Sequence, residues 1–327
     1  MRILLLGATG TIGQAVAKAL LDRGYQVVCP LRQHAERKLG RTTAALADRL
    51  VGADVRTGSA GASLLTELEA LQFERFDAVV SCLASRTGAP EDAWAVDYGM
   101  NSALLKLAQQ AGIHQFVLLS AICVQKPLLA FQQAKLAFER ELINSGLRYS
   151  IVRPTAFFKS LSGQLQRVRD GKPFMLFGDG QLTACKPISD DDLAQFIALC
   201  LTDHQKFNRI LPIGGPGEAI TPLEQGHYLF KQLGIRPRFM HVPVALLSTI
   251  IVGLDAFKIL LPALADKAAL AKIGRYYATE SMLVWDETRR RYDAHATPSF
   301  GSQTLFDHYD HLIAEGRTVD LGDHAVF

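Results

Sequence analysis

Residues 2–21 read RILLLGATGTIGQAVAKALL. An apolar run leads into Gly7, Gly10 and Gly13, and a helical pattern follows with Ile12 and Val16 on one face. This order predicts a strand, a tight turn and a helix. In such a unit the glycines let the backbone approach a pyrophosphate, and the helix N-terminus contributes N–H donors. The stretch therefore predicts a dinucleotide-binding site.

Four further apolar runs, at 25–31, 76–84, 115–121 and 148–154, resemble the first. Helical patterns separate them, including a leucine-rich face between residues 64 and 71. Continuous apolar runs are typical of strands that are covered on both faces. Strands that alternate with helices predict an α/β fold with a Rossmann-type doubly wound parallel sheet. We expect this domain to span residues 1–155.

The pattern loosens after residue 155. Turn residues surround short strands at 171–181 and 208–217, and helices are expected at 189–202, 221–233 and 243–265. We expect residues 156–327 to form a smaller substrate-binding region packed on the carboxyl edge of the sheet, where open α/β sheets bind ligands. The very apolar segment 243–265 is either a buried or lid helix, or a wall for a hydrophobic ligand or a membrane-surface contact.

Composition excludes several classes of function. A net charge of +3 and a pI near 8.6 are too mild for nucleic-acid binding. No apolar segment reaches the ~20 residues of a spanning helix, and no signal peptide is evident. We therefore expect a cytoplasmic protein that is at most peripheral to a membrane.

Nine histidines without metal-ligand spacing predict no protein-bound metal. Five widely spaced cysteines predict free thiols that serve as small core residues.

The residues at the end of the second predicted strand determine whether the site prefers NAD or NADP. An acid there would bind the ribose 2′-hydroxyl of NAD. No acid occurs in residues 28–33, and Arg32, Arg37 and Lys38 lie at or just beyond this point. A guanidinium binds a 2′-phosphate well, so NADPH is favoured, with Arg32 as the best candidate. Arg37 and Lys38 suit a solvated helix face equally well.

Longer segments carry a family likeness: VVSCLASRTG (79–88), FVLLSAICVQKPL (116–128), SIVRPTAFFKSLSGQ (150–164), FGDGQLTACKPIS (177–189) and IGRYYATESMLVWD (273–286). With the glycine turn, they resemble the extended and atypical short-chain dehydrogenase/reductases. Within that group they are similar to the NADPH-dependent 8-vinyl reductases of 3,8-divinyl (proto)chlorophyllide a, over roughly residues 1–300. The resemblance implies an oxidoreductase that reduces the C8 vinyl group of a magnesium tetrapyrrole to ethyl in chlorophyll or bacteriochlorophyll biosynthesis.

The resemblance also implies which residues contact the cofactor. These are Gly7, Thr9, Gly10, Thr11, Ile12, Gly13, Arg32, Ser81, Cys82, Leu83, Ser120, Lys135, Pro154, Thr155, Ala156 and Phe157. Ser59 stands where many relatives place an Asp against the adenine.

The catalytic position departs from the wider superfamily. A Tyr four residues before the active-site Lys usually donates the proton, but here Phe131 precedes Lys135. If hydride adds to the terminal vinyl carbon, negative charge spreads into the macrocycle, and a weaker acid or water can protonate it. Lys135 is then the expected catalytic side chain, which binds the nicotinamide ribose and adds positive potential. The alternative is that Phe131 and Phe138 form a buried helix face and Lys135 is solvated.

The expected substrate contacts are Gln125, Phe131, Phe158, Lys159 and Tyr276. Lys159 or Lys126 would meet the propionate, Tyr277 is a further pocket candidate, and His227 or His241 could ligate the substrate's magnesium. Core Phe and surface Lys remain alternatives. Two other functions stay open: a non-catalytic NADP-binding sensor or assembly protein, and a reductase of another conjugated alkene.

Overall fold

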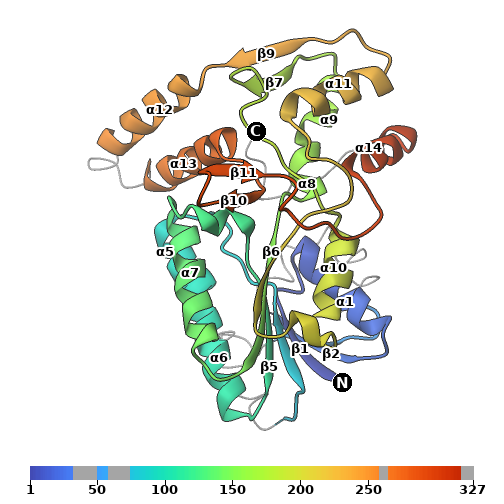
Figure 1. The fold of residues 1–327 in the computed structure, drawn as a ribbon, viewed down its shortest axis with the longest axis vertical. Coiled ribbons are helices and arrows are strands. Elements are labelled where there is room, and N and C mark those ends of the chain that lie inside the picture. The colour runs from blue at the N-terminus through green and yellow to red at the C-terminus, as the bar shows by residue number, and fades with distance from the viewer. Residues whose placement is uncertain (32–49, 58–73, 258–263, 318–327) are drawn as a thin grey trace.

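A seven-stranded parallel sheet forms the lower half of the molecule (Figure 1). The computed structural model describes residues 1–31, 50–57, 74–257 and 264–317. The strands occur in the order β3-β2-β1-β4-β5-β6-β8, and every neighbouring pair is parallel. They are β1 (Arg2–Leu6), β2 (Gln26–Leu31), β3 (Asp54–Thr57), β4 (Ala78–Ser81), β5 (Gln115–Leu119), β6 (Arg148–Pro154) and β8 (Arg209–Ile213). The predicted doubly wound fold and its five predicted strands are confirmed.

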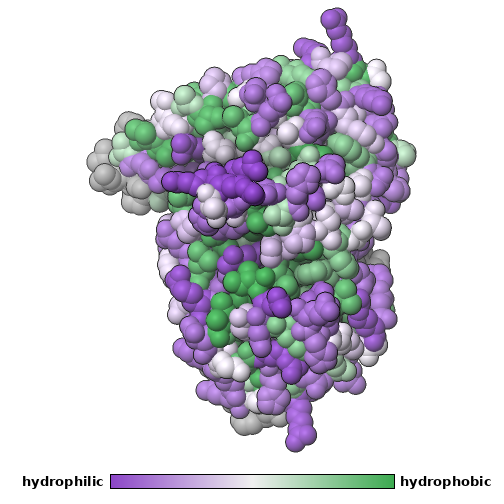
Figure 2. Space-filling model, in the orientation of Figure 1, coloured by the Kyte–Doolittle hydropathy of each residue, from purple (hydrophilic) through white to green (hydrophobic). Residues whose placement is uncertain are grey.

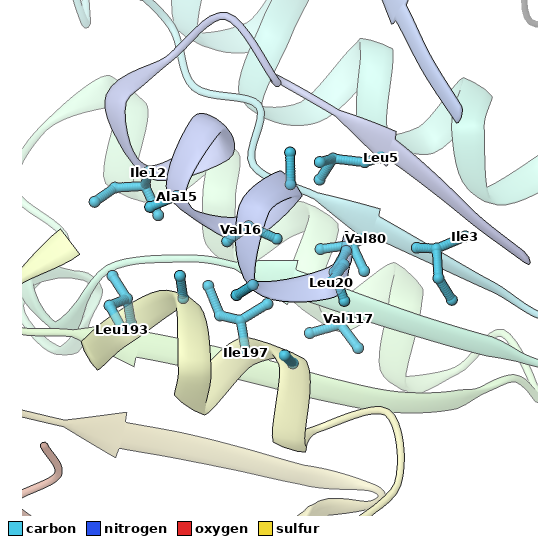
Figure 3. Close-up of a cluster of buried hydrophobic side chains, with 14 of the residues drawn as sticks. Ile3, Leu5, Ile12, Ala15, Val16, Leu20, Val80, Val117, Leu193 and Ile197 are labelled. Atoms are coloured by element: carbon cyan, nitrogen blue, oxygen red, sulfur yellow. The ribbon is translucent and has the colours of Figure 1, made fainter. Parts of the chain in front are cut away.

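Helices cover both faces of the sheet. On one face α1 (Thr11–Leu21) packs against α10 (Asp190–Leu199), and on the other lie α6 (Asn101–Gln110) and α7 (Ala130–Ile143) (Figure 1). Figure 3 shows Val16 of α1 and Ile197 of α10 meeting Val80 and Val117 of the sheet. These side chains are fully buried, as are Phe116 and Phe138 in the cluster on the opposite face, which explains why the strands are apolar on both faces.

The remaining elements lie mainly over the carboxyl edge of the sheet (Figure 1). They are α5 (Pro90–Ala93), the π-helical η2 (Trp94–Met100), η3 (Ile122–Gln125), α8 (Phe158–Leu161), η4 (Ser162–Gln164), α9 (Leu165–Arg169), β7 (Phe174–Phe177), η5 (His204–Lys206), α11 (Pro222–Gln232), β9 (Phe239–Val242), α12 (Val244–Phe257), α13 (Ala265–Thr279), β10 (Val284–Asp286), β11 (Arg291–Asp293) and α14 (Leu305–Ala314). Two small sheets, parallel β7-β9 and antiparallel β10-β11, hold this part together with a second apolar core around Phe158, Phe230 and Tyr309.

Local sequence signals begin several of these helices. The Ser189 hydroxyl accepts the N–H of Asp192 at the start of α10. Thr221 and Glu224 form a capping box on α11, as do Thr304 and Asp307 on α14. The predicted helices at 189–202 and 221–233 are thus confirmed. The leucine-rich face at 64–71 lies outside the described residues.

The apolar segment expected as one helix at 243–265 contains α12, and α13 begins at its end. Along residues 244–256 no side chain is buried, and Leu246, Ile250 and Val252 are 50, 45 and 69% exposed. A buried helix is therefore excluded for this stretch. No helix in the described ranges has the length and apolar character needed to cross a membrane.

Two elements beyond residue 155 belong to the sheet and its helical layers. Strand β8 pairs with β6 at the sheet edge, and α10 packs on α1. The chain therefore returns to the sheet after it has begun to build the part above the carboxyl edge. This return places the segments 155–159 and 186–188 side by side, through the bond from the Thr155 hydroxyl to the Lys186 carbonyl.

Candidate active site

The turn after β1 is shaped by two glycines. Gly7 has φ of 81°, and a Cβ there would lie 2.5 Å from the carbonyl oxygen of Cys82. A Cβ on Gly13 would lie 2.0 Å from the carbonyl oxygen of Gly7. Side chains at either position would separate β1, α1 and the end of β4. The turn leaves the first N–H groups of α1 at the carboxyl edge, which is the arrangement that binds a pyrophosphate.

The end of β4 lies against this turn. The Cys82 N–H donates to the carbonyl of Leu6 at 2.9 Å. Burial raises the pKa of the Cys82 thiol to about 12, so this thiol stays neutral beside the dinucleotide turn. The Ser81 hydroxyl donates to Oδ1 of Asn101 at 2.6 Å, which commits its proton to the protein. The structure thus brings together the predicted groups 7–13 and 81–83.

Lys135 is held by an acid that the sequence did not indicate. Its Nζ lies 2.8 Å from Oδ1 of Asp97, and the two side chains are only 11 and 0% exposed. The alternative of a solvated Lys135 is therefore excluded. Phe131, one turn earlier on α7, is 9% exposed, and Phe138 is fully buried.

Ser120 follows β5 at the same edge, but its hydroxyl faces the protein. It donates to Oε1 of Glu139 at 2.5 Å, and Arg153 forms an ion pair with the same carboxylate. Glu139 is 1% exposed. The Ser120 hydroxyl, on a residue expected to contact the cofactor, is thus part of a buried Ser120–Glu139–Arg153 network. Neither Glu139 nor Arg153 was predicted.

The segment after β6 continues along the edge. Pro154 ends the strand, and the Thr155 N–H donates to the Ile213 carbonyl of β8 at 2.9 Å. The Ala156 carbonyl accepts the Ile188 N–H at 3.0 Å, and Phe157 packs partly buried on the core that contains α1. Backbone bonds on both sides thus fix residues 154–157 beside the glycine turn.

Lys159 reaches the cofactor turn, although the sequence predicts that it binds the propionate carboxylate of the substrate. Its Nζ lies 3.4 Å from the Thr11 hydroxyl at the N-terminus of α1. An ammonium at this point complements a phosphate group, because both it and the helix N-terminus favour negative charge. The geometry therefore places Lys159 with the dinucleotide turn.

Three other expected substrate contacts are occupied by the protein itself. Phe158 is 3% exposed in the apolar core around Phe230 and Tyr309, and its ring centroid lies 5.3 Å from that of His308. The amide of Gln125 bonds to the backbone of Leu283 and Trp285 at 2.9 and 2.7 Å. The alternative of a core Phe thus describes Phe158, and the amide of Gln125 is engaged with the backbone. Lys126, a further candidate, pairs with Glu280 at 2.5 Å, so that its charge is neutralised.

Tyr276 lies with Phe131 in an apolar cluster. The cluster also contains Ala93, Ile122, Cys123, Ala134, Cys185, Ile273 and Met282. The Tyr276 hydroxyl donates to the Cys123 carbonyl at 2.9 Å, and burial raises its pKa. Its hydroxyl proton is therefore bound to the backbone and is less acidic than usual. Tyr277 is 39% exposed.

Some predicted positions fall elsewhere. Arg32, Arg37, Lys38 and Ser59 lie outside the described residues. His241 is on β9, with Nδ1 donating to the Gly178 carbonyl at 2.8 Å, and His227 packs on Phe239.

The cysteines and the other potential metal ligands are distributed as follows in the structure. All five cysteines are free thiols, and four are buried. Across the described part of the chain, no three His, Cys, Asp or Glu side chains gather as metal ligands would.

Comparison with known proteins agrees with this geometry. A model of NAD(P)H-binding domains matches residues 7–204. Divinyl chlorophyllide a 8-vinyl-reductase of Cucumis sativus is 48% identical over 99% of this chain and 79% of its own length, and that of Arabidopsis thaliana is 46% identical over the same shares. The chain belongs to the divinyl chlorophyllide a 8-vinyl-reductase family. Both relatives are described as chloroplastic.

More distant likenesses are informative as well. Photosystem II assembly factor Ycf39 of Cyanophora paradoxa is 28% identical over 66% of this chain and 64% of its own length. The NADPH-dependent quinone oxidoreductase of Escherichia coli, solved with NADPH, superposes with a TM-score of 0.65 at 19% identity and covers 95% of this chain and 99% of its own. The structural likeness shows that the two chains share a fold.

Proposed function

We propose that the chain reduces the C8 vinyl group of divinyl chlorophyllide or protochlorophyllide to ethyl, with NADPH as the reductant, in chlorophyll or bacteriochlorophyll biosynthesis. The observation that carries the proposal is 46–48% identity to 8-vinyl reductases over 99% of the chain. The local geometry supports it, since the glycine turn, Lys135 and Lys159 meet the needs of a phosphate-bearing cofactor at the carboxyl edge.

The residues present fit a bound dinucleotide. Gly7 and Gly13 let β1, α1 and the end of β4 pack closely enough to form a dinucleotide turn, and Lys159 adds positive charge beside Thr11 of that turn. When bound, NADPH would supply the hydride. Residues 28–31 contain no acid to select the 2′-hydroxyl of NAD, and Arg32 follows as the candidate for the 2′-phosphate. The chain thus favours the phosphorylated cofactor.

The catalytic role falls to Lys135, without a partner tyrosine. Its ammonium would donate a hydrogen bond to the nicotinamide ribose and place positive potential near the reacting vinyl group. Hydride addition at the terminal vinyl carbon moves the π electrons toward the macrocycle, which delocalises the charge. A general acid of matched pKa is therefore less important than in carbonyl reduction, where the charge sits on one oxygen.

On the substrate side, Phe131 and Tyr276 are the aromatic candidates of the apolar cluster near Lys135. Phe131 lies one turn before Lys135 on α7, in the cluster that also contains Tyr276. Its ring would offer a flat apolar contact to the tetrapyrrole. Tyr276 would shape this wall through its ring, since its hydroxyl is bound to the backbone.

A second candidate function is that of a non-catalytic NADP-binding assembly protein. Its support is the 28% identity to an assembly factor over 66% of the chain. The reductases match more of the chain at higher identity, and the buried Lys135 is a feature that a pure sensor does not need. Reductase activity is therefore the favoured function.

We also propose that α12 contacts the surface of a photosynthetic membrane. Residues 244–254 carry no charge, yet none of these side chains is buried. Figure 2 shows hydrophobic residues at the surface near the upper left, where α12 lies in Figure 1. Large apolar side chains that are exposed together on one element often mark an interaction site. An apolar surface of this kind, docked in the lipid headgroup region, would suit an enzyme whose substrate is hydrophobic.

The reductase proposal is tested by incubating the purified protein with NADPH and divinyl chlorophyllide a. We expect a blue shift of the Soret band as conjugation is lost, and a product two mass units heavier. NADPH binding without turnover of authentic substrate would contradict the proposal and favour the assembly-protein function.

Introducing the missing phenol tests the proposed chemistry. We expect that Phe131→Tyr does not raise kcat for vinyl reduction, because the delocalised charge needs no acid at that point. The check is steady-state kinetics beside NADPH titration, which should show unchanged cofactor affinity. A gain approaching the ~10²–10⁴-fold typical of general acid catalysis would mean that proton delivery at this position limits the reaction.

The membrane contact is tested with the double variant Ile250→Glu/Val252→Glu. Two charges on exposed positions of α12 should lower co-sedimentation with phosphatidylglycerol vesicles and leave NADPH affinity intact. Val51→Glu, at a position that is 72% exposed near β3, is the matched control. If the unmodified protein does not bind vesicles, or if the double variant binds them equally well, the contact is disproved.

A further inference from the structure

The chain that follows β4 contains an irregular helix. Between α5 and α6, residues Trp94–Met100 form the π-helical η2. A π turn breaks the regular ladder of backbone hydrogen bonds, and such turns occur often at functional sites. Here the turn contains Asp97, whose side chain is fully buried. A helix irregularity that carries a buried acid calls for an account of both features.

Asn101 ties this turn to the sheet. Its Nδ2 donates to the carbonyl of Asp97 at 3.1 Å and lies 3.4 Å from that of Val96, while its Oδ1 accepts the Ser81 hydroxyl at 2.6 Å. Asn101 is 1% exposed. The last residue of β4 is thus linked through one amide to the backbone that carries Asp97. The position of Asp97 is therefore set by the end of the strand that passes beside the dinucleotide turn.

The partner of Asp97 lies beyond the strand ends. Helix α7 runs back along the sheet (Figure 1), and its Glu139 bonds to Ser120 just after β5. Lys135 lies one turn earlier on α7, about 6 Å along the helix axis. This step takes it past the end of β5, into the region where open α/β sheets bind their ligands.

The Asp97–Lys135 pair is incomplete as a structural salt bridge. Among the described residues, Oδ2 of Asp97 has no hydrogen-bond partner, and Oδ1, which forms the ion pair with Lys135, accepts only a long bond of 3.4 Å from the Ser85 N–H. Buried ion pairs stabilise a fold only when their remaining lone pairs are satisfied. The arrangement is thus poor for stability and well suited to holding a single ammonium in one place.

We infer that Asp97 is the positioning residue of Lys135. Its carboxylate, fixed to the end of β4 through Asn101, holds the ammonium at the carboxyl edge through their ion pair. Held there, the ammonium can donate to the cofactor ribose. This inference rests on the proposed function, and it assigns to the η2 turn the role of setting the geometry of Lys135.

The inference predicts the effect of Asp97→Asn. The variant keeps the shape of the side chain but removes the charge that holds the ammonium, so it should weaken NADPH binding and lower kcat. A misplaced catalytic group can cost about 100-fold in rate. Glu91→Gln, which removes an exposed acid of α5 in the same segment, is the matched control and should change neither quantity.

A double-mutant cycle separates positioning from a merely structural role. In the Lys135→Ala background, Asp97→Asn should change NADPH affinity and kcat by less than ~2-fold, because Asp97 then has no ammonium to position. Two independent sites would instead give additive changes in free energy. Asp97→Glu, which restores the charge, should recover part of the lost activity. Multiplicative effects of the two substitutions, or an Asp97→Asn variant with unchanged kcat and affinity, would overturn the inference.

Two further readouts keep the test decisive. If Asp97→Asn folds poorly, the double variant with Lys135→Ala should recover the melting temperature, since it leaves no unpaired ammonium; failure to recover it would count against the pairing. NADPH titration requires no tetrapyrrole, so it tests Asp97 even if the chain does not reduce divinyl chlorophyllide. Absence of turnover in the unmodified protein contradicts only the proposed function.

Discussion

The contact of the Gly7 turn with the carbonyl of Cys82 fixes the relative positions of β1, α1 and the end of β4. Neither Gly7 nor Gly13 leaves room for a methyl group, so three segments meet at the shortest distance that backbone allows. This contact places the first turn of α1, with its free N–H groups, at the carboxyl edge of the sheet. Because η2 follows β4 and is tied to Ser81 by Asn101, it also determines where the Asp97–Lys135 pair lies.

The same edge contains two nearly fully buried acids, and both pair with cations. Asp97 pairs with Lys135, and Glu139 pairs with Arg153 while accepting from Ser120. Replacing such a pair by apolar side chains is often neutral or stabilising by ~1–4 kcal/mol, whereas removing one partner alone is costly. Stability thus gives little reason to keep these charges. The chemistry of a phosphate-bearing cofactor and of a carbanion-like transition state gives a direct one.

Much of the fold follows from patterns that act locally. The five apolar runs became strands because each is buried on both faces, and the glycine turn fell where the first run ends. The sequence predicts a short strand within 208–217 but puts it in the substrate-binding region, and only the pairing of β8 with β6 places it in the main sheet. Sequence found Lys135 but not Asp97, because a lone acid in a helix looks the same whether it is exposed, like Glu91, or buried. The burial of Phe158 and the bonds of Gln125 to distant backbone leave no local mark in the sequence, so only the structure shows these contacts.

The central claim is that hydride reaches the terminal vinyl carbon and that charge passes into the macrocycle, which makes the missing tyrosine harmless. The direct measurement is isotope tracing with NADPH deuterated at the transferred position of nicotinamide C4, followed by NMR of the product. The account predicts deuterium in the methyl group of the new ethyl substituent and solvent hydrogen on the adjacent carbon. Deuterium on the carbon next to the ring, or in neither position, would contradict it.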